Sequence, residues 1–151
     1  MYLSKKKTIA IIGGGASGVF ASIRCAEVAK NNNIDVDICV FETTTNFLKK
    51  VRISGGGRCN VTHDCLDPRE LSRSYPRGEK SLIGPFHRFG AADTVEWFAG
   101  RGVALKTEAD GRMFPETDSS QTIVDALLGA AEAAGVSIRT SEGVTSVVKN
   151  E

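Results

Sequence analysis

Glycine runs at two places in the chain could bring the backbone close to a phosphorylated ligand. The first run is "IIGGGASG", residues 11–18, and the second is "ISGGGRCN", residues 53–60. Glycine loses more conformational entropy on folding than any other residue, so each run indicates a backbone that must turn sharply or approach another group closely. The second run also carries an arginine and a cysteine. These two runs are therefore the candidate binding segments of the sequence.

The first run lies inside a predicted strand–helix–strand unit. A short apolar stretch predicts a buried strand over residues 8–12, and an apolar face at helical spacing predicts a helix over residues 16–30. A stretch rich in β-branched residues predicts a second strand over residues 34–41. A unit of this length implies two parallel strands with the helix as their crossover connection.

Within that unit, the spacing of the glycines is typical of a dinucleotide-binding loop. Gly13, Gly15 and Gly18 form a G-x-G-x-x-G pattern, and an acidic residue, Glu42, follows the second strand. Gly13 permits the tight turn, Gly15 lets the backbone approach a pyrophosphate, and Gly18 lets the helix pack closely. The helix N-terminus favours the phosphates, and Glu42 can accept hydrogen bonds from ribose hydroxyls. A carboxylate there would repel a 2′-phosphate, which disfavours NADP at this site.

The second run bears on a choice that the first leaves open, between NAD and FAD. A simple NAD site predicts a short connection and another helix after Glu42. The sequence has instead a loop rich in glycine and in cations, which are Lys49, Lys50, Arg52 and Arg58. Such a loop suits a second approach to the same diphosphate, or contact with a flavin ring. The pattern favours FAD, with the NAD-binding domain of a dehydrogenase as the alternative.

The rest of the chain predicts further helices and strands around this unit, and the predicted fold class is α/β. Residues 43–81 show no convincing period and are expected to be irregular. The later predicted elements are a helix over residues 93–99 with Trp97 on its core face, a hairpin turning at Asp110-Gly111, a helix capped by Asp118 or Ser119 and ended by Gly135, and strands over residues 136–140 and 144–148.

Two longer segments carry a resemblance to a known family. "KVRISGGGRCNVT", residues 50–62, together with "DGRMFPETDSSQTIVDAL", residues 110–127, resembles the BaiN/RdsA-like family of FAD-dependent oxidoreductases, often labelled aminoacetone-oxidase-like. The resemblance runs over essentially the whole chain. It implies a Rossmann-like FAD-binding domain of glutathione-reductase type, into which a substrate domain is inserted. It also implies hydride transfer through the flavin, with NADH or NADPH as a possible reductant.

The same resemblance implies a set of cofactor-binding residues. It places the FAD pyrophosphate at Gly13, Gly15, Ala16, Ser17 and Gly18, and the adenosine ribose at Glu42. In the second run, the implied flavin-proximal residues are Ser54, Gly55, Gly56, Arg58, Cys59 and Asn60, and the backbone of Val144 is expected at the adenine. Lys50, one of the cations beside the run, is a further candidate for cofactor binding. No residue is assigned as a catalytic acid or base.

Length is the one large departure from the family pattern. The 151 residues suit a single domain, whereas family members are much longer. We therefore expect residues 1–151 to be the N-terminal part of an FAD/NAD(P)-binding Rossmann-like domain that lacks its C-terminal strands. We also expect these residues by themselves to be inactive as an oxidoreductase.

Cys59 and Cys65 suggest two rival interpretations. A flavoprotein disulfide reductase uses a closely spaced cysteine pair, but the present spacing is one residue longer than is usual for that class. The same cysteines with His63 and Asp64 could suggest a metal site, but the segment lacks a zinc-type spacing and a clear fourth ligand. We expect no bound metal, and the disulfide reductase remains an alternative function.

Composition limits the partners. The chain has 19 basic and 18 acidic residues and a net charge of +1, so nothing in the balance predicts DNA or a membrane as a partner. The four cysteines are not spaced like a disulfide framework, which makes the cytoplasm the default location. The substrate, a small molecule or an RNA, and the oligomeric state are not predicted.

Overall fold

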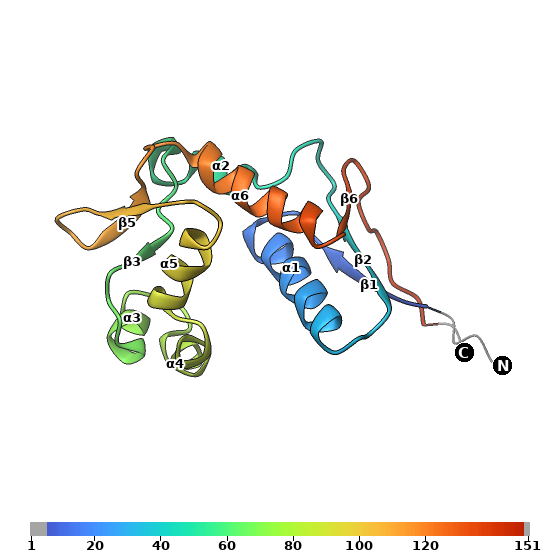
Figure 1. The fold of residues 1–151 in the computed structure, drawn as a ribbon, viewed down its shortest axis with the longest axis horizontal. Coiled ribbons are helices and arrows are strands. Elements are labelled where there is room, and N and C mark those ends of the chain that lie inside the picture. Colours follow the sequence, from blue (N-terminus) through green and yellow to red (C-terminus); the bar gives the residue numbers. More distant parts are fainter. Residues whose placement is uncertain (1–5, 150–151) are drawn as a thin grey trace. The chain divides into compact units, whose positions relative to one another are not determined.

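The computed structural model of the chain describes residues 6–149, which form two compact units (Figure 1). Unit 1 comprises the chain up to Val51 and from Leu127 onward, and unit 2 comprises Arg52–Ala126. The boundaries fall inside two helices, α2 (Lys49–Ile53) and α6 (Ser120–Ala133). The two glycine runs therefore belong to different units.

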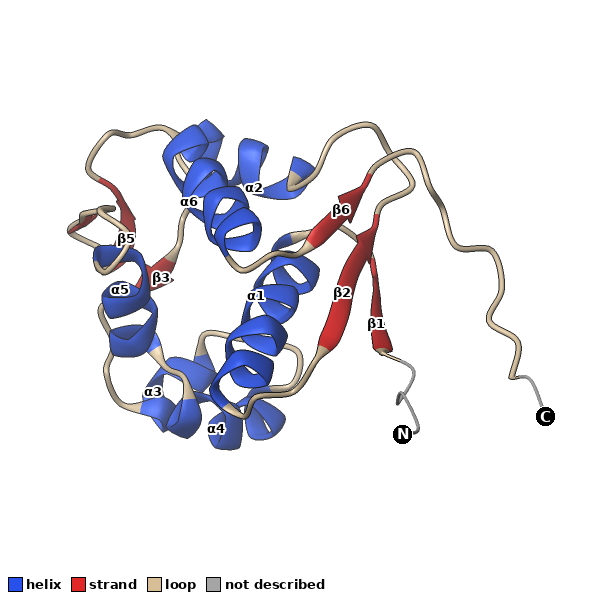
Figure 2. Ribbon diagram, turned by 45° about the vertical axis from the view of Figure 1, so that its right-hand side comes forward, coloured by secondary structure: helices blue, strands red, loops and turns tan. Residues whose placement is uncertain are grey.

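Unit 1 is built on a parallel sheet. Its strands are β1 (Lys7–Ile12), β2 (Val36–Phe41) and β6 (Ser137–Arg139), in the order β1-β2-β6. Helix α1 (Ala16–Asn31) connects β1 to β2 and lies along them (Figure 2). The predicted strand–helix–strand unit is confirmed, with β2 beginning two residues later than predicted.

The core of unit 1 follows from the helical pattern seen in the sequence. Val19 and Ile23 lie one turn apart on α1 and are buried together with Val40 of β2. At the end of α6, Gly135 adopts a left-handed φ of +73°, and the next N–H, that of Val136, donates to the Ala131 carbonyl at 3.0 Å. This is the helix stop that a C-terminal glycine provides, and it allows β6 to begin directly afterwards.

Unit 2 contains a small antiparallel sheet surrounded by short helices. The strands have the order β3-β5-β4, and the helices α3 and α4 pack against each other. The elements are the 3₁₀ turn η1 (Ser54–Gly57), β3 (Thr62–His63), α3 (Pro68–Arg73), α4 (Glu79–Arg88), α5 (Ala91–Ala99), β4 (Leu105–Thr107) and β5 (Arg112–Pro115). The predicted hairpin is confirmed as the β4–β5 pair.

The core of unit 2 gathers around Phe114 of β5, which has no exposed surface. Trp97 and Phe98 of α5 are also buried, which confirms the predicted core position of Trp97. The guanidinium of Arg101 stacks on the Trp97 ring at 3.7 Å from its centroid. Large aromatic side chains supply most of the apolar burial that holds a small unit of this kind together.

The prediction that residues 43–81 are irregular is wrong, because this stretch contains α2, η1, β3, α3 and the start of α4. Local signals hold the short helices. Asp67 accepts backbone N–H bonds from Arg69 and Glu70, both at 2.9 Å, and so caps α3. Helices of five or six residues are too short to show a helical period in the sequence, and their packing stabilises them.

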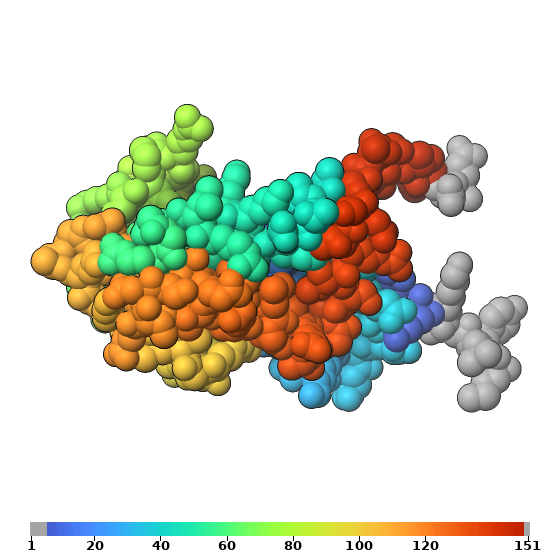
Figure 3. All heavy atoms as spheres, turned by 90° about the horizontal axis from the view of Figure 1, so that it is seen from above, coloured from blue at the N-terminus to red at the C-terminus, as the bar shows by residue number. Residues whose placement is uncertain are grey.

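The strand predicted over residues 144–148 is also not formed. The chain there is extended and exposed, and Figure 3 shows it in red as an arm that leaves the rest of unit 1. Val147 is 86 % exposed and Val148 is 77 % exposed. A β-strand requires hydrogen bonds from a neighbouring strand, and no described segment pairs with this one. Within residues 6–149, no helix combines the length and the apolar character needed to cross a bilayer.

Candidate functional site

The carboxyl ends of β1 and β2 bring the first glycine run beside the acidic residue. The parallel register pairs Ile12 with Phe41, so the two residues that follow, Gly13 and Glu42, leave the sheet next to each other. The Gly13 N–H donates to the Phe41 carbonyl at 2.8 Å, and the Glu42 N–H donates to the Arg139 carbonyl at 2.8 Å. Ligands of open parallel sheets bind at this edge, so the sheet places the predicted residues where such a site forms.

The three fingerprint glycines differ in what each one permits. Gly13 has a φ of +103°, a conformation that side-chain-bearing residues avoid. A Cβ atom at Gly18 would lie 2.0 Å from the Gly13 carbonyl oxygen, so only glycine allows α1 to approach the turn this closely. A Cβ atom at Gly15 would meet nothing within 4 Å. Gly15 therefore leaves space at the start of α1, where helical N–H groups have no partner within the helix.

Glu42 is held as an ionised carboxylate at the side of this space. Its Oε2 accepts the Gly14 N–H at 2.9 Å, and its Oε1 accepts both the N–H and the hydroxyl of Thr44 at 2.8 Å. The backbone hydrogen bonds from Thr44 and Gly14 are the main reason that the pKa of Glu42 lies below its usual value. A carboxylate has about four acceptor positions, so Oε2 still has one available for a ligand hydroxyl.

A hollow of about 560 Å³ opens at this edge of unit 1. Residues 12–18 of the first glycine run and Glu42 line it, and the start of α2 lines it with two lysines, Lys49 and Lys50. The predicted residues that the structure brings together here are Gly13, Gly15, Ala16, Ser17, Gly18, Glu42 and Lys50. The hollow combines unpaired helical N–H groups, two cations and one carboxylate, which is a chemistry suited to phosphates next to a sugar hydroxyl.

Sequence reasoning missed the residues that support this hollow from behind. A Cβ atom at Gly14 would lie 2.1 Å from Cδ1 of Phe47, so the ring of Phe47 packs directly on the loop. The Leu48 N–H donates to the Gly14 carbonyl at 2.9 Å. Thr44 fixes Glu42, as described above. The sequence held one sign of this contact. The fingerprint does not require glycine at position 14, and yet a glycine is present there.

The segment before Val144 runs beside the loop that carries Glu42. The Ser141 N–H donates to the Thr44 carbonyl and the Glu142 N–H donates to the Glu42 carbonyl, both at 3.0 Å. Val144 itself is 39 % exposed. The structure thus places this segment next to the candidate ribose-binding residue, and the contact of Val144 with adenine stays a prediction.

The second glycine run, in unit 2, has a different backbone. Gly55, Gly56 and Gly57 all adopt left-handed φ values, of 55°, 70° and 87°, and Cys59 follows with a φ of 64°. The Cys59 N–H closes the loop by donating to the Ser54 carbonyl at 3.0 Å. Residues with side chains rarely adopt the left-handed conformation, and here three consecutive residues adopt it. The path of the backbone therefore requires the glycines.

Two close contacts fix the second run within unit 2. A Cβ atom at Gly55 would lie 2.8 Å from Cε1 of Phe114 and 2.9 Å from the backbone nitrogen of Asn60. A Cβ atom at Gly56 would meet nothing within 4 Å. The side-chain amide of Asn60, with its nitrogen turned toward the backbone carbonyls, donates to the Thr62 carbonyl at 2.9 Å. Gly56 is therefore the point at which the run leaves room for another group.

Arg58 is paired with carboxylates of its own unit. Its Nη1 contacts Glu108 and lies 3.5 Å from Oδ1 of Asp118. The guanidinium carbon lies over the Phe114 ring, 4.0 Å from its centroid. The hydrogen bond to Glu108 is the main cause that raises the pKa of Arg58 above its usual value. Arg58 was predicted as one of four cations in a loop suited to a diphosphate or a flavin ring, and the structure shows that its charge has partners.

The cysteines do not favour the disulfide-reductase alternative. All four are free thiols, and burial raises the pKa of Cys59 against a weaker opposing effect from its hydrogen bond with Ser54. A nucleophilic thiol needs a lowered pKa. Cys65 donates its thiol to the Asp67 carbonyl at 3.7 Å. In the part of the chain that the structure describes, no three His, Cys, Asp or Glu side chains are grouped so that they could hold a metal ion.

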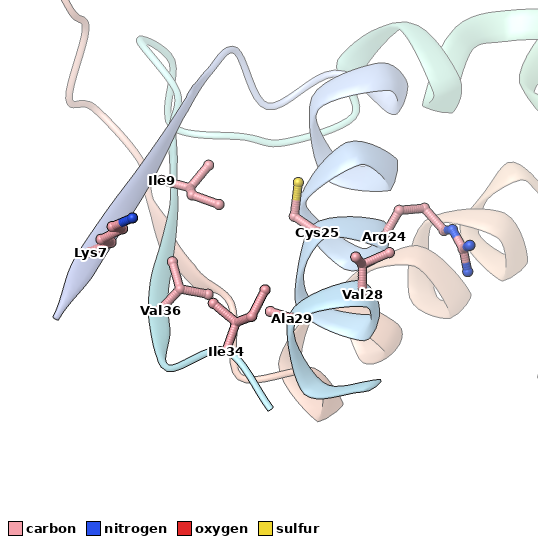
Figure 4. A pocket seen from close by; sticks show the side chains of 8 residues that line it. All are labelled: Lys7, Ile9, Arg24, Cys25, Val28, Ala29, Ile34 and Val36. Atoms are coloured by element: carbon pink, nitrogen blue, oxygen red, sulfur yellow. The ribbon is translucent and has the colours of Figure 1, made fainter. Parts of the chain in front are cut away.

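A second hollow of unit 1 lies at the opposite, amino end of the strands. It has a volume of about 390 Å³ and lies between β1, β2 and α1 (Figure 4). Its surface is almost wholly apolar, with Ile9, Val28 and Ile34 among its lining residues, and the guanidinium of Arg24 points away from it. This hollow lacks the polar groups that a phosphorylated ligand requires, so the candidate site is the hollow at the carboxyl end.

Comparisons with known proteins identify the family and the fold. The Rossmann domain of HI0933-like proteins matches residues 7–151. The chain belongs to this family. The HI0933-like chain is 31 % identical over 119 residues to the 3-dehydro-bile acid delta(4,6)-reductase of Clostridium scindens, and 30 % identical over 141 residues to the ribosomal RNA dihydrouridine synthase of Escherichia coli. These matches cover 79 % and 93 % of the chain.

One solved structure shows the fold independently. The crystal structure of Thermovibrio ammonificans THI4 matches the HI0933-like chain with a TM-score of 0.52 at 15 % identity, over 90 % of this chain and 38 % of that one. At such an identity the likeness concerns the fold alone. The chain spans 27 % and 33 % of the lengths of the two relatives named above. The resemblance found in the sequence and the predicted Rossmann-like fold are thus confirmed.

Proposed function

We propose that this chain is the FAD-binding part of a flavin-dependent oxidoreductase. The observation that carries the proposal is the hollow at the carboxyl ends of β1 and β2, where the open space at Gly15 lies beside the carboxylate of Glu42. A Cβ atom would project into this space, so the backbone there is shaped for close approach by a ligand. An adenosine diphosphate group fits these residues, because it combines phosphates with a ribose that donates hydroxyl hydrogen bonds.

The predicted cofactor-binding residues of unit 1 then have definite tasks. The N–H groups of Ala16, Ser17 and Gly18 begin α1 and would bind the pyrophosphate together with the positive end of the helix dipole. Glu42 would accept a ribose hydroxyl on Oε2, held in orientation by Thr44. Lys50 adds positive charge at the rim, and the backbone at Val144 would contact the adenine.

The second glycine run supports FAD over NAD. We propose that Ser54, Gly55, Gly56, Arg58, Cys59 and Asn60 contact the flavin-bearing half of the cofactor. The support is the run of left-handed glycines with open space at Gly56, together with the matching motif of the FAD-dependent family. The names of the two relatives also denote redox chemistry, since a reductase and a dihydrouridine synthase both add hydrogen to a double bond.

In this proposal, bound FAD supplies hydride transfer, and the residues of the chain bind and orient it. NADH or NADPH is the proposed reductant. The substrate of the whole protein is proposed to be either a small organic molecule or an RNA, the two classes that the relatives' names represent. We propose a cytoplasmic location, because the four cysteines are not spaced like a disulfide framework.

A pair of glycine substitutions tests the assignment. Gly15 has a φ of −79°, which alanine adopts easily, so Gly15→Ala should cost only the weaker N-cap of α1, about 1 kcal/mol or less, while its methyl group obstructs the pyrophosphate. We expect FAD affinity to fall roughly tenfold or more, equivalent to about 1.4 kcal/mol. The measurement is FAD titration by flavin fluorescence on the protein expressed from its complete gene.

The matched control is Gly129→Ala, which adds the same methyl group to α6 where it meets nothing within 4 Å. This variant should bind FAD normally and gain stability of roughly 1 kcal/mol from helix propensity. Protein that binds no FAD but is stabilised by NAD would contradict the proposal and favour the dehydrogenase alternative.

A further inference from the structure

The guanidinium of Arg58 is fixed from three directions by residues that lie far from it in sequence. Glu108 follows β4, Asp118 precedes α6, and Phe114 presents its ring face from β5. Both ion pairs are made through the same nitrogen, Nη1. The side chain of Arg58 nevertheless keeps one third of its surface exposed. An arginine held in this way has one defined orientation and still presents an edge to its surroundings.

The two carboxylates belong to a larger group whose charges balance. Asp118 also pairs with Lys106, and Glu108 lies 3.5 Å from Arg112, which pairs with Asp110 at 2.7 Å. The group thus contains three cations, Arg58, Lys106 and Arg112, and three carboxylates, Glu108, Asp110 and Asp118. The net charge of the group is zero. Of its six members, only Arg58 belongs to the second glycine run.

We propose that Glu108 and Asp118 are positioning residues, which orient Arg58 and cancel its charge so that the second glycine run presents a neutral polar edge to the flavin. This inference rests on the proposed function. A reduced flavin at neutral pH carries negative charge, and an unpaired arginine beside it would stabilise that state and raise its reduction potential. Paired carboxylates oppose this effect. The carboxylates therefore keep the potential lower than the arginine alone would set it.

Removing one carboxylate charge at a time tests the inference. Glu108→Gln and Asp118→Asn nearly preserve the shapes of the side chains and each leaves a net charge of +1. The flavin reduction potential of each variant, measured by dye-coupled titration of the FAD-loaded protein, should rise relative to wild type. The rise should be larger for Glu108→Gln, because Glu108 is closer to Arg58 and less exposed than Asp118, at 30 % against 45 %.

Two controls separate charge from structure. Glu96→Gln removes the same charge from the exposed side of α5 and should leave the potential unchanged. Glu108→Asp keeps the charge and should leave the potential near that of wild type, even if the shorter side chain lowers stability in urea unfolding. A merely structural role for Glu108 would make Glu108→Asp at least as damaging as Glu108→Gln.

The outcomes distinguish this inference from the proposed function. A higher potential in both neutralised variants, with both controls near wild type, supports it. Wild-type protein that binds FAD while neither neutralised variant changes the potential overturns the inference and leaves the proposed function intact. Wild-type protein that binds no FAD overturns both. If Glu108→Gln does not fold, Asp118→Asn decides the matter alone.

Discussion

The two glycine runs contain the same three letters but use them for opposite reasons. In the first run only Gly13 has a left-handed φ, and the other glycines are needed for space, as the 2.0 Å approach at Gly18 shows. In the second run Gly55, Gly56 and Gly57 are all left-handed. In the first loop neighbours crowd Gly14 and Gly18 while Gly15 faces open space, whereas in the second loop the backbone path requires all three glycines. Substitutions should therefore fail in different ways in the two loops.

The largest effect is expected for Gly18→Val. Its Cβ would lie 2.0 Å from a backbone oxygen that cannot move without displacing the turn after β1. We expect unfolding to become easier by about 1–3 kcal/mol or more, together with complete loss of FAD binding. Urea unfolding and FAD titration measure the two effects. Near-native stability in this variant would show that crowding does not explain the first run.

In the second run, alanine substitutions at Gly55 and Gly56 should lower stability by unequal amounts. Both Gly55→Ala and Gly56→Ala introduce a left-handed alanine, at about 1–2 kcal/mol each. Only Gly55→Ala also forces a contact, at 2.8 Å from Phe114, so it should be the more damaging by a further 1 kcal/mol or so. Gly56→Asn should be milder still, since asparagine tolerates this conformation. Equal losses for Gly55→Ala and Gly56→Ala would contradict the assigned contact.

A smaller effect is expected at Thr44, where the first run depends on an oriented carboxylate. Thr44→Val removes a hydroxyl hydrogen bond to Glu42 and keeps the backbone one, so FAD affinity should fall several-fold, equivalent to about 0.5–1.5 kcal/mol. Thr44→Ser retains the hydroxyl and should bind nearly as wild type. If serine and valine behave alike, the hydroxyl does not orient Glu42.

The smallest effect concerns pH. The pKa of folded Glu42 lies below its ordinary value of 4.5, so its hydrogen bonds contribute stability above that value. This contribution is lost as the pH falls through the lower, folded pKa. Wild type should therefore lose stability more steeply than Glu42→Gln as the pH drops below 4.5. Thermal unfolding between neutral and acidic pH measures the difference, and parallel curves would contradict the assigned hydrogen bonds.

The sequence was sufficient where the physical signal is local and periodic. The strand–helix–strand unit was predictable because α1 is long enough to repeat its apolar face, and because glycine spacing and Glu42 mark both ends of the crossover. Helix α6 was predictable for the same reason, and its cap is Ser119, whose hydroxyl accepts the Gln121 N–H at 3.3 Å. Asp118, the other predicted cap, pairs with Lys106 and Arg58 instead.

What the sequence could not supply depends on contacts between distant residues. The packing of Phe47 on Gly14 and the pairing of Arg58 with Glu108 join positions whose separation no local pattern encodes. The short helices between residues 49 and 88 likewise depend on packing more than on propensity. The prediction at residues 144–148 failed because β propensity indicates only that these residues suit a strand, whereas a strand forms only where a neighbouring strand pairs with it.

The four cysteines differ in exposure in a way that offers one natural labelling position in each unit. Cys39 and Cys59 are buried, whereas Cys25 of unit 1 and Cys65 of unit 2 are both partly exposed. Maleimide dyes or nitroxide spin labels should therefore attach first at one position in each unit, without any engineered thiol. Energy transfer or dipolar spectroscopy would then measure the distance between the two labels with and without the nucleotide.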